Sequence, residues 1–387
     1  MEERGLRLVG STPLDGRGDT MGVALGDGHV YVGHTGFSDA GTSIVDVRDP
    51  AHPRLVRQLP RPPGTRTAKV VVVGDTLLTS GERELDWGEP PFVRPVGGAP
   101  EWTGGMAVYD VSTPAEPRRI GFYATEGVGV HRMTWTGGRH AYVTASDDGH
   151  TDQFLHIVDL SDPTRPTEAG RWWYPGMCEG GGERPRFPDG RRYALHHALV
   201  EGDLVFCGWW DAGLVILDAA DVSRPQLVAN LNWGPAESGA THTALPLPGR
   251  DLLVVTDEAI LPDCRDIPKQ VRVFDVSDPY SPALLSTLPV PEGDFCDRGG
   301  RFGPHNLGEF RPGTGFGADE VYLTYFNAGL RVYDLRDPAR PVEVAAFVPD
   351  PPQPGGVPQV DDVTLGPDGI VYLTDRRGGG LHILERL

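Results

Sequence analysis

The sequence is organised by a motif that occurs six times. Each copy is an alternating apolar strand that ends in Asp and runs into a Pro-rich turn, as in LHIVDLSDPTRP from Leu155 and VRVFDVSDPYSP from Val271. The Asp residues are Asp46, Asp110, Asp159, Asp218, Asp275 and Asp334. Pro removes a backbone donor and so ends the strand, while Asp can cap the turn. The copies recur at roughly 50 to 64 residues, the period of propeller blades.

A seventh copy, GLHILERL, ends the chain and leaves no residues for a strand after it. The segment LRLVGSTPL, from Leu6 to Leu14, has the pattern of the missing strand and precedes the first full repeat. Pairing the two would close a ring and hide its sheet edges. We therefore predict an all-β protein, a seven-bladed β-propeller in one domain spanning residues 1–387, with residues 6–14 completing the last blade.

These features resemble the LVIVD-repeat β-propeller family over nearly the whole chain. The resemblance rests on the third strand and its turn, on first strands of the form His-x-apolar-x-apolar, and on the Ala-Gly-Leu hairpins that follow Asp211 and Asn327. It implies the propeller fold. It implies little about activity, because one fold supports many functions.

Composition and charge narrow the functional classes. The net charge of −19 argues against non-specific binding to nucleic acid or to an anionic membrane surface. The sequence begins with MEERGLRLVG, which is charged from the start, so we expect neither a secretory signal nor a membrane span, and a cytoplasmic protein. The spacing of Cys178, Cys207, Cys264 and Cys296 fits no zinc or redox motif. The cysteines allow a disulfide, but none is expected in a reducing cytoplasm.

Long insertions fall in two classes of loop that share one face of a propeller. Loops leading into first strands are long at Gly176 to Leu195, Val290 to Pro304 and Pro349 to Val360, and loops between second and third strands are long at Gly81 to Gly105 and Glu258 to Gln270. Loops on one face of a rigid scaffold are the usual place for binding and catalysis. Aromatic and acidic hairpin residues on this face, such as Trp210, Asp257 and Glu258, suit a small organic ligand.

The first strands suggest a metal site. Aligning them by their turns places one residue per blade at the axis: Met21, Thr67, His131, His196, His242, His305 and Asp361. Four neutral imidazoles at one height suit a divalent transition metal, with Fe favoured and Zn, Mn, Cu and Ni as alternatives. We predict His131, His196, His242 and His305 as its ligands. His197 is the alternative to His196, because a register shift of one residue exchanges the residue that faces inward.

Other residues near this axis receive predicted roles. Asp361 or Asp362 is a candidate fifth ligand or general base, and Arg132, with Lys69, is a candidate for holding a substrate carboxylate. Several acids are candidates for orienting the imidazoles or for catalysis. They are Glu179, Asp211, Asp257 and Glu309.

Four axial His in a seven-bladed ring is similar in architecture to carotenoid cleavage oxygenases, which hold Fe(II) in this way. The analogy implies an Fe(II) oxygenase acting on a small organic substrate. A lyase, isomerase or hydrolase that uses Zn or Mn as a Lewis acid is the alternative within the enzymes. A protein-binding scaffold without a metal is the alternative outside them. The oligomeric state and the substrate cannot be read from the sequence.

Overall fold

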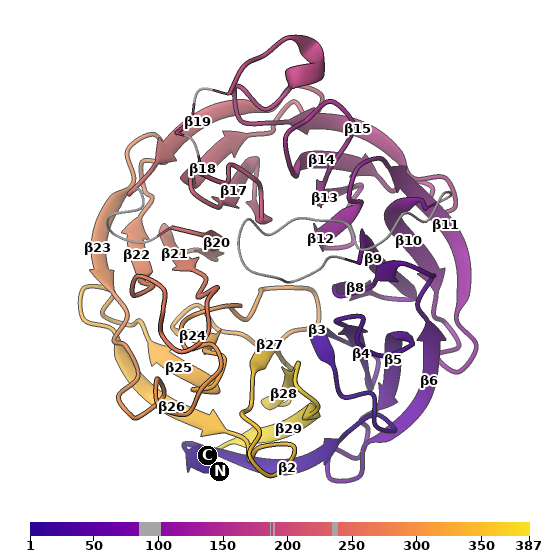
Figure 1. Ribbon diagram of the computed structural model, residues 1–387, viewed down its shortest axis with the longest axis vertical. Helices are drawn as coiled ribbons and strands as arrows, with labels where there is room; N and C mark the ends of the chain where they lie inside the picture. The colour runs from indigo at the N-terminus through magenta and orange to yellow at the C-terminus, as the bar shows by residue number, and fades with distance from the viewer. Residues whose placement is uncertain (85–101, 186, 189, 234–238) are drawn as a thin grey trace.

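A computed structural model describes residues 1–84, 102–185, 187–188, 190–233 and 239–387 of the chain. Seven antiparallel sheets stand side by side around a central axis (Figure 1). The described residues include a single short helix, the 3-10 turn η1 (Glu179–Gly181). The predicted all-β, seven-bladed propeller is confirmed.

The first three blades contain thirteen strands. Blade one has β3 (Thr20–Gly26), β4 (His29–His34), β5 (Ala40–Asp46) and β6 (Arg54–Pro60). Blade two has β7 (Thr65–Arg66), β8 (Val70–Val73), β9 (Thr76–Arg83), β10 (Gly104–Asp110) and β11 (Arg118–Thr125). Blade three has β12 (Val130–Thr134), β13 (His140–Ala145), β14 (Phe154–Asp159) and β15 (Thr167–Trp172).

The remaining blades follow the same order. Blade four has β16 (His197–Glu201), β17 (Leu204–Trp209), β18 (Gly213–Asp218) and β19 (Gln226–Leu231). Blade five has β20 (Thr241–Leu247), β21 (Leu252–Asp257), β22 (Val271–Asp275) and β23 (Ala283–Thr287). Blade six has β24 (Glu320–Thr324), β25 (Leu330–Asp334) and β26 (Val342–Val348). Blade seven has β27 (Val360–Leu365), β28 (Ile370–Asp375) and β29 (Gly380–Arg386).

The N-terminus closes the ring. Strand β2 (Leu6–Thr12) pairs antiparallel with β29, which confirms that the opening segment completes the last blade. A strand not anticipated from the sequence, β1 (Glu2–Arg4), goes on to pair with β26 of blade six. The two ends of the chain lie together at the outer edge of these two blades (Figure 1). The opening residues therefore tie two neighbouring blades to each other.

The repeated Asp forms the same turn in all six copies. Its Oδ1 accepts a hydrogen bond from the backbone N–H two residues later, at 2.8 Å in Asp159, Asp218, Asp275 and Asp334. The same bond is 3.1 Å at Asp46 and 2.9 Å at Asp110. Each third strand also shifts register against its fourth strand shortly before the Asp. The Asp–Pro signature therefore stabilises the turn between the third and fourth strands in six of the seven blades.

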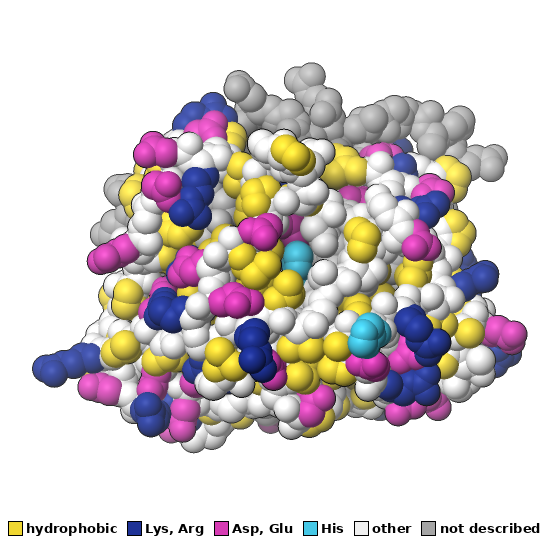
Figure 2. All heavy atoms as spheres, turned by 90° about the horizontal axis from the view of Figure 1, so that it is seen from below, with side chains coloured by type: hydrophobic (Ala, Val, Ile, Leu, Met, Phe, Trp, Pro, Cys, Tyr) yellow, Lys and Arg dark blue, Asp and Glu magenta, His cyan; other side chains and the backbone are white. Residues whose placement is uncertain are grey.

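The core lies between neighbouring blades. One buried cluster joins Val71 and Leu78 of blade two to Met133 and Val143 of blade three, and comparable clusters fill the other junctions. The rim of the ring carries interspersed acidic and basic side chains on the side seen in Figure 2. Among the described residues, no helix is long and apolar enough to cross a membrane. Most of the long loop predicted between Gly81 and Gly105 lies outside the described residues.

Candidate metal centre

A cavity of about 700 Å³ opens on the axis of the ring. His131, His196, His242 and His305, one from each of blades three to six, line it together with Met21 of blade one. Each imidazole is almost fully buried, with His131 the most exposed at 8%. All four predicted ligands therefore line one cavity.

The imidazoles form a continuous arc. Ring centroids are separated by 4.9 Å between His131 and His196, by 3.7 Å between His196 and His242, and by 4.6 Å between His242 and His305. The Nε2 atoms of His131 and His196 are 3.1 Å apart. Two nitrogens that bind one metal at about 2.1 Å lie roughly 3 Å apart when they occupy adjacent positions. The spacing of this pair therefore matches two ligands of a shared ion.

The opposite nitrogen of each ring is fixed by an oxygen atom. Nδ1 of His131 lies 2.9 Å from a Glu82 carboxylate oxygen, and Nδ1 of His196 lies 3.1 Å from the His242 carbonyl. Nδ1 of His242 lies 2.8 Å from the Thr243 hydroxyl, and Nδ1 of His305 lies 2.9 Å from the Asp361 carbonyl. An imidazole that donates through Nδ1 carries its lone pair on Nε2, which is the usual preparation for metal binding.

Burial keeps the rings neutral. It holds the pKa of His196, His242 and His305 well below the usual value, and it lowers the pKa of His131 against the opposing effect of Glu82. The Nε2 atom of His242 is buried and has no hydrogen-bond partner among the described residues. A buried acceptor without a partner is costly unless something binds it. This atom is the clearest indication within the arc that a ligand belongs there.

Glu258 supplies a carboxylate beside the imidazoles. One oxygen lies 3.9 Å from His242 Nε2, and the other lies 3.6 Å from His305 Nε2 and 2.9 Å from an Arg301 nitrogen. His196, His242 and Glu258 each offer a ligand atom within 4.8 Å of the other two. Burial raises the pKa of Glu258. A carboxylate with a raised pKa at this position suits either a fifth ligand or a proton acceptor.

The two acids predicted for that role lie outside the cavity wall. Asp361 is fully buried, and its carboxylate pairs with Arg376 and, at 3.5 Å, with Lys69. One of its oxygens lies 3.8 Å from Nδ1 of His305, on the side of the ring away from Nε2. Asp362 lies 3.7 Å from Lys69 and accepts the backbone N–H of Val23 at 3.4 Å. Its pKa is raised by burial. The structure thus places Glu258 beside the Nε2 atoms of the arc, and Asp361 beside Nδ1 of His305.

Strand alternation explains where Arg132 and His197 lie. Successive side chains of a strand point to opposite faces, so the neighbours of His131 and His196 point away from the cavity. Arg132 is buried and donates to Asn306 at 2.6 Å and to Glu309 at 2.8 Å. His197 Nε2 contacts the Thr134 hydroxyl at 3.0 Å and lies 3.6 Å from Glu309. Arg132 therefore joins blades three and six beneath the site and does not reach a ligand in the cavity.

The remaining acids named from the sequence also have other partners. Glu179 lies in the exposed turn η1 and does not line the cavity. Asp211 accepts the backbone N–H of Arg192 at 2.9 Å, and Asp257 pairs with Arg272 and accepts from Thr241 at 2.8 Å. Glu309 pairs with Arg132 and Arg311. In the described part of the structure, none of the four acids accepts a hydrogen bond from a ring nitrogen of the arc. The expectation that these acids orient the imidazoles is therefore wrong.

Blade two supplies residues that the sequence did not single out. Glu82 accepts from His131 Nδ1 and from Arg66 Nε at 2.7 Å, and it also accepts from Gln153 at 3.2 Å. Arg66 and Lys69 line the cavity, whereas Thr67 turns away and donates to the Gly41 carbonyl. Glu82 could have been recognised from its place at the end of a second strand, where the other blades also carry polar residues. The long loop that follows Glu82 made it difficult to align this strand with the second strands of the other blades.

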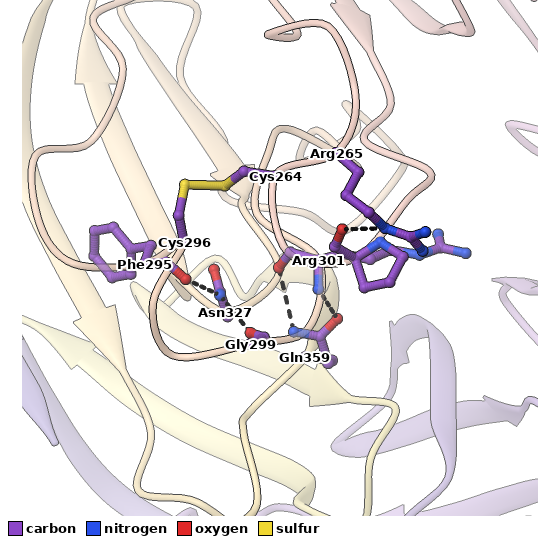
Figure 3. Close-up of a disulfide and its surroundings, with 9 residues drawn as sticks. Cys264, Arg265, Phe295, Cys296, Gly299, Arg301, Asn327 and Gln359 are labelled. Atoms are coloured by element: carbon purple, nitrogen blue, oxygen red, sulfur yellow. Dashed lines mark hydrogen bonds between the residues drawn. A yellow bond between two sulfur atoms is a disulfide. The ribbon is translucent and has the colours of Figure 1, made fainter.

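Two inserted loops at the cavity mouth are joined by a disulfide between Cys264 and Cys296 (Figure 3). The first loop contributes Leu261, Pro262 and Arg265 to the wall, and the second contributes Gly300 and Arg301. Asn327 donates to the carbonyls of Phe295 and Gly299, at 2.8 and 2.9 Å, and fixes the second loop from below. The expectation of no disulfide is therefore wrong. Two loops from neighbouring blades fold against each other on one face and bring Cys264 and Cys296 together.

The chain carries LVIVD repeats: the LVIVD repeat profile matches residues 17–59, 135–173 and 198–232. This confirms the resemblance seen in the sequence. Comparison with curated proteins finds no match.

Solved structures show the same fold at low identity. A periplasmic gluconolactonase of Pseudomonas aeruginosa superposes with a TM-score of 0.59 at 14% identity, covering 94% of this chain and 93% of that one. A putative 6-phosphogluconolactonase of Bacteroides uniformis gives 0.59 at 10% identity, covering 90% and 97%. The Cps50 (Swd1) β-propeller domain of Myceliophteria thermophila gives 0.58 at 12% identity, covering 94% and 96%. At these identities the likeness establishes the propeller architecture and nothing further.

Proposed function

We propose that this protein is a metal-dependent enzyme with its metal on the propeller axis. The ligands are the Nε2 atoms of His131, His196, His242 and His305, and Glu258 lies beside them. One observation carries the proposal: an oxygen atom fixes Nδ1 of every one of these rings, so all four can present an Nε2 lone pair to the same cavity. An imidazole-rich site suits Fe, Zn, Mn, Cu or Ni rather than Ca or Mg.

The reaction we propose is hydrolysis of a small organic ester or lactone. A divalent metal supplies Lewis acidity and lowers the pKa of a water molecule. Glu258 takes a proton from that water, whose oxygen bonds to the substrate carbonyl carbon. The carbon–oxygen bond to the leaving group then breaks, and Glu258 returns the proton to the departing oxygen. A raised pKa suits Glu258 to both transfers. Two neighbours with the same fold are named as lactonases, which is consistent with this reaction class.

Fe(II) oxygen chemistry is the second candidate, because imidazole ligands suit Fe as well as Zn. The two candidates differ in what they require. Hydrolysis needs Glu258 and proceeds without oxygen, whereas an oxygenase consumes O₂ and requires iron. Oxygen uptake by the iron-loaded protein, measured beside ester cleavage under nitrogen, separates them.

The primary experiment is metal analysis of the purified protein. We expect about one equivalent of a transition metal, and at least a tenfold loss of it in His242→Ala and His305→Ala. His52→Ala, whose side chain is 82% exposed on an outer turn, serves as the matched control and should retain the metal. Glu258→Gln should retain most of the metal and lower kcat for ester cleavage by about 10²- to 10⁴-fold. Metal-free protein of unchanged stability would refute the proposal and favour a protein-binding scaffold.

The disulfide also bears on the compartment. Disulfides persist in oxidising environments and are rare in the cytosol of most organisms. The cross-link between Cys264 and Cys296 therefore supports an oxidising location over the expected cytoplasm. Alkylation of the protein in its native cells, with and without prior reduction, tests this: oxidised cysteines should label only after reduction.

A further inference from the structure

The cavity wall carries an excess of positive charge in an acidic protein. Seven Lys and Arg side chains and two Glu side chains line it, whereas the whole chain has a net charge of −19. The cations near the mouth are Arg192, Arg265, Arg301, Arg376 and Arg377, above Arg66 and Lys69. Asp152, Asp361 and Asp362 pair with some of these cations from behind the wall, and positive charge still prevails when they are counted. The overall acid excess therefore does not describe this cavity.

Three of these arginines are held in fixed orientations. Arg192 donates to both carboxylate oxygens of Asp152, at 2.8 and 3.1 Å, and its guanidinium carbon lies 4.2 Å from the Trp210 ring centroid. Arg376 pairs with Asp361, and Arg301 with Glu258. Because each guanidinium has five N–H donors, one acidic partner leaves others available for a ligand.

Two aromatic residues at equivalent hairpin positions support these guanidinium groups. Phe326 of blade six lies 5.4 Å from the guanidinium carbons of both Arg301 and Arg376, and its ring stacks on His305 at 4.6 Å. Trp210 of blade four lies beside Arg192, with 6.3 Å between its ring and that of His196. Both residues have positive φ, 46° for Phe326 and 34° for Trp210. Strained backbone of this kind is concentrated at functional sites, where the surrounding structure maintains it.

The cations retain N–H groups for a further ligand although acids accompany the buried ones. Arg265 and Arg377 are exposed. The other five cations pair with Glu82, Glu258, Asp152, Asp361 and Asp362. The planar fork of Arg matches a carboxylate or phosphate through two parallel hydrogen bonds.

We propose that the cavity binds a small organic anion, whose carboxylate or phosphate contacts the N–H groups of Arg192, Arg301 and Arg376. The reacting group of that molecule then lies over the imidazole arc and Glu258. Only the position of the reacting group over the imidazoles rests on the proposed function. The arginines give the site selectivity for charge, and the metal centre gives it the reaction.

Calorimetric titration with three six-carbon compounds tests the proposal. They are gluconate, which carries a carboxylate, glucose 6-phosphate, which carries a phosphate, and glucose, which is the neutral control. With protein as purified, and in parallel after treatment with a chelator, we expect at least one anion to bind about tenfold or more tighter than glucose. The anion that binds tighter identifies the oxyanion that the site prefers.

Variants link the binding to the named residues. Arg192→Gln and Arg376→Gln should each weaken anion binding about tenfold, while Arg192→Lys should retain part of it. Arg224→Gln, on an exposed outer turn, is the control and should bind as wild type does. Circular dichroism verifies that each variant is folded. Glucose binding as tightly as the anions, or unchanged anion binding in both glutamine variants, would overturn the proposal. Anion binding by a protein that never takes up metal would contradict the proposed enzyme and leave this inference standing.

Discussion

At the scale of single residues, the orientation of the imidazoles depends on the spacing of the backbone around them. Gly208 in β17 packs against the next blade so closely that a Cβ atom there would lie 2.3 Å from the His242 carbonyl oxygen. That carbonyl accepts from His196 Nδ1. A glycine at this position therefore allows two neighbouring ligands to keep their orientation.

We predict that Gly208→Ala weakens metal binding about tenfold or more, because the added methyl group must displace the His242 backbone. Metal affinity measured by competition with a chelator provides the readout. Gly138→Ala is the control, since a Cβ atom there would meet nothing within 4 Å and its backbone is not in the left-handed region. Wild-type metal affinity in Gly208→Ala would show that the ligands tolerate this displacement.

At the scale of elements, the inner ends of four blades supply the imidazoles and inserted loops form the mouth of the cavity. The loops are less constrained than the strands, and the disulfide compensates for this by joining the loop after β21 to the loop before blade six. The two cysteines are separated by 32 positions in the sequence. Closing a loop of this length in the unfolded chain is worth about 3–4 kcal/mol of stability in the chain-entropy account.

We therefore expect Cys264→Ser to lower the free energy of unfolding by about 3 kcal/mol. Guanidinium denaturation with and without a thiol reductant measures the effect. The reductant should lower the midpoint of the wild-type protein and leave that of Cys264→Ser unchanged. Cys178→Ser, which removes a free cysteine, is the control. A wild-type midpoint that does not respond to the reductant would argue against the cross-link.

At the scale of the whole molecule, the ring was predictable because its period, turns and closing strand are all local patterns. The six Asp turns and the pairing of β2 with β29 follow directly from them. The four axial His were predictable for the same reason, since each stands at the same point of its repeat in the sequence. Partners drawn from different blades were not predictable. The pairing of Glu82 with His131 and that of Cys264 with Cys296 depend on how the blades and their loops meet, which no single repeat encodes.

The central claim is that one metal ion is shared by imidazoles from four blades. The most direct measurement is a crystal structure of the metal-loaded protein with anomalous scattering recorded at the absorption edge of the bound metal. The account predicts one strong anomalous peak on the axis, about 2.0–2.2 Å from the Nε2 atoms of His131, His196, His242 and His305. A metal-loaded crystal whose anomalous peak lies elsewhere, with the four rings bound only to protein or water, would contradict it.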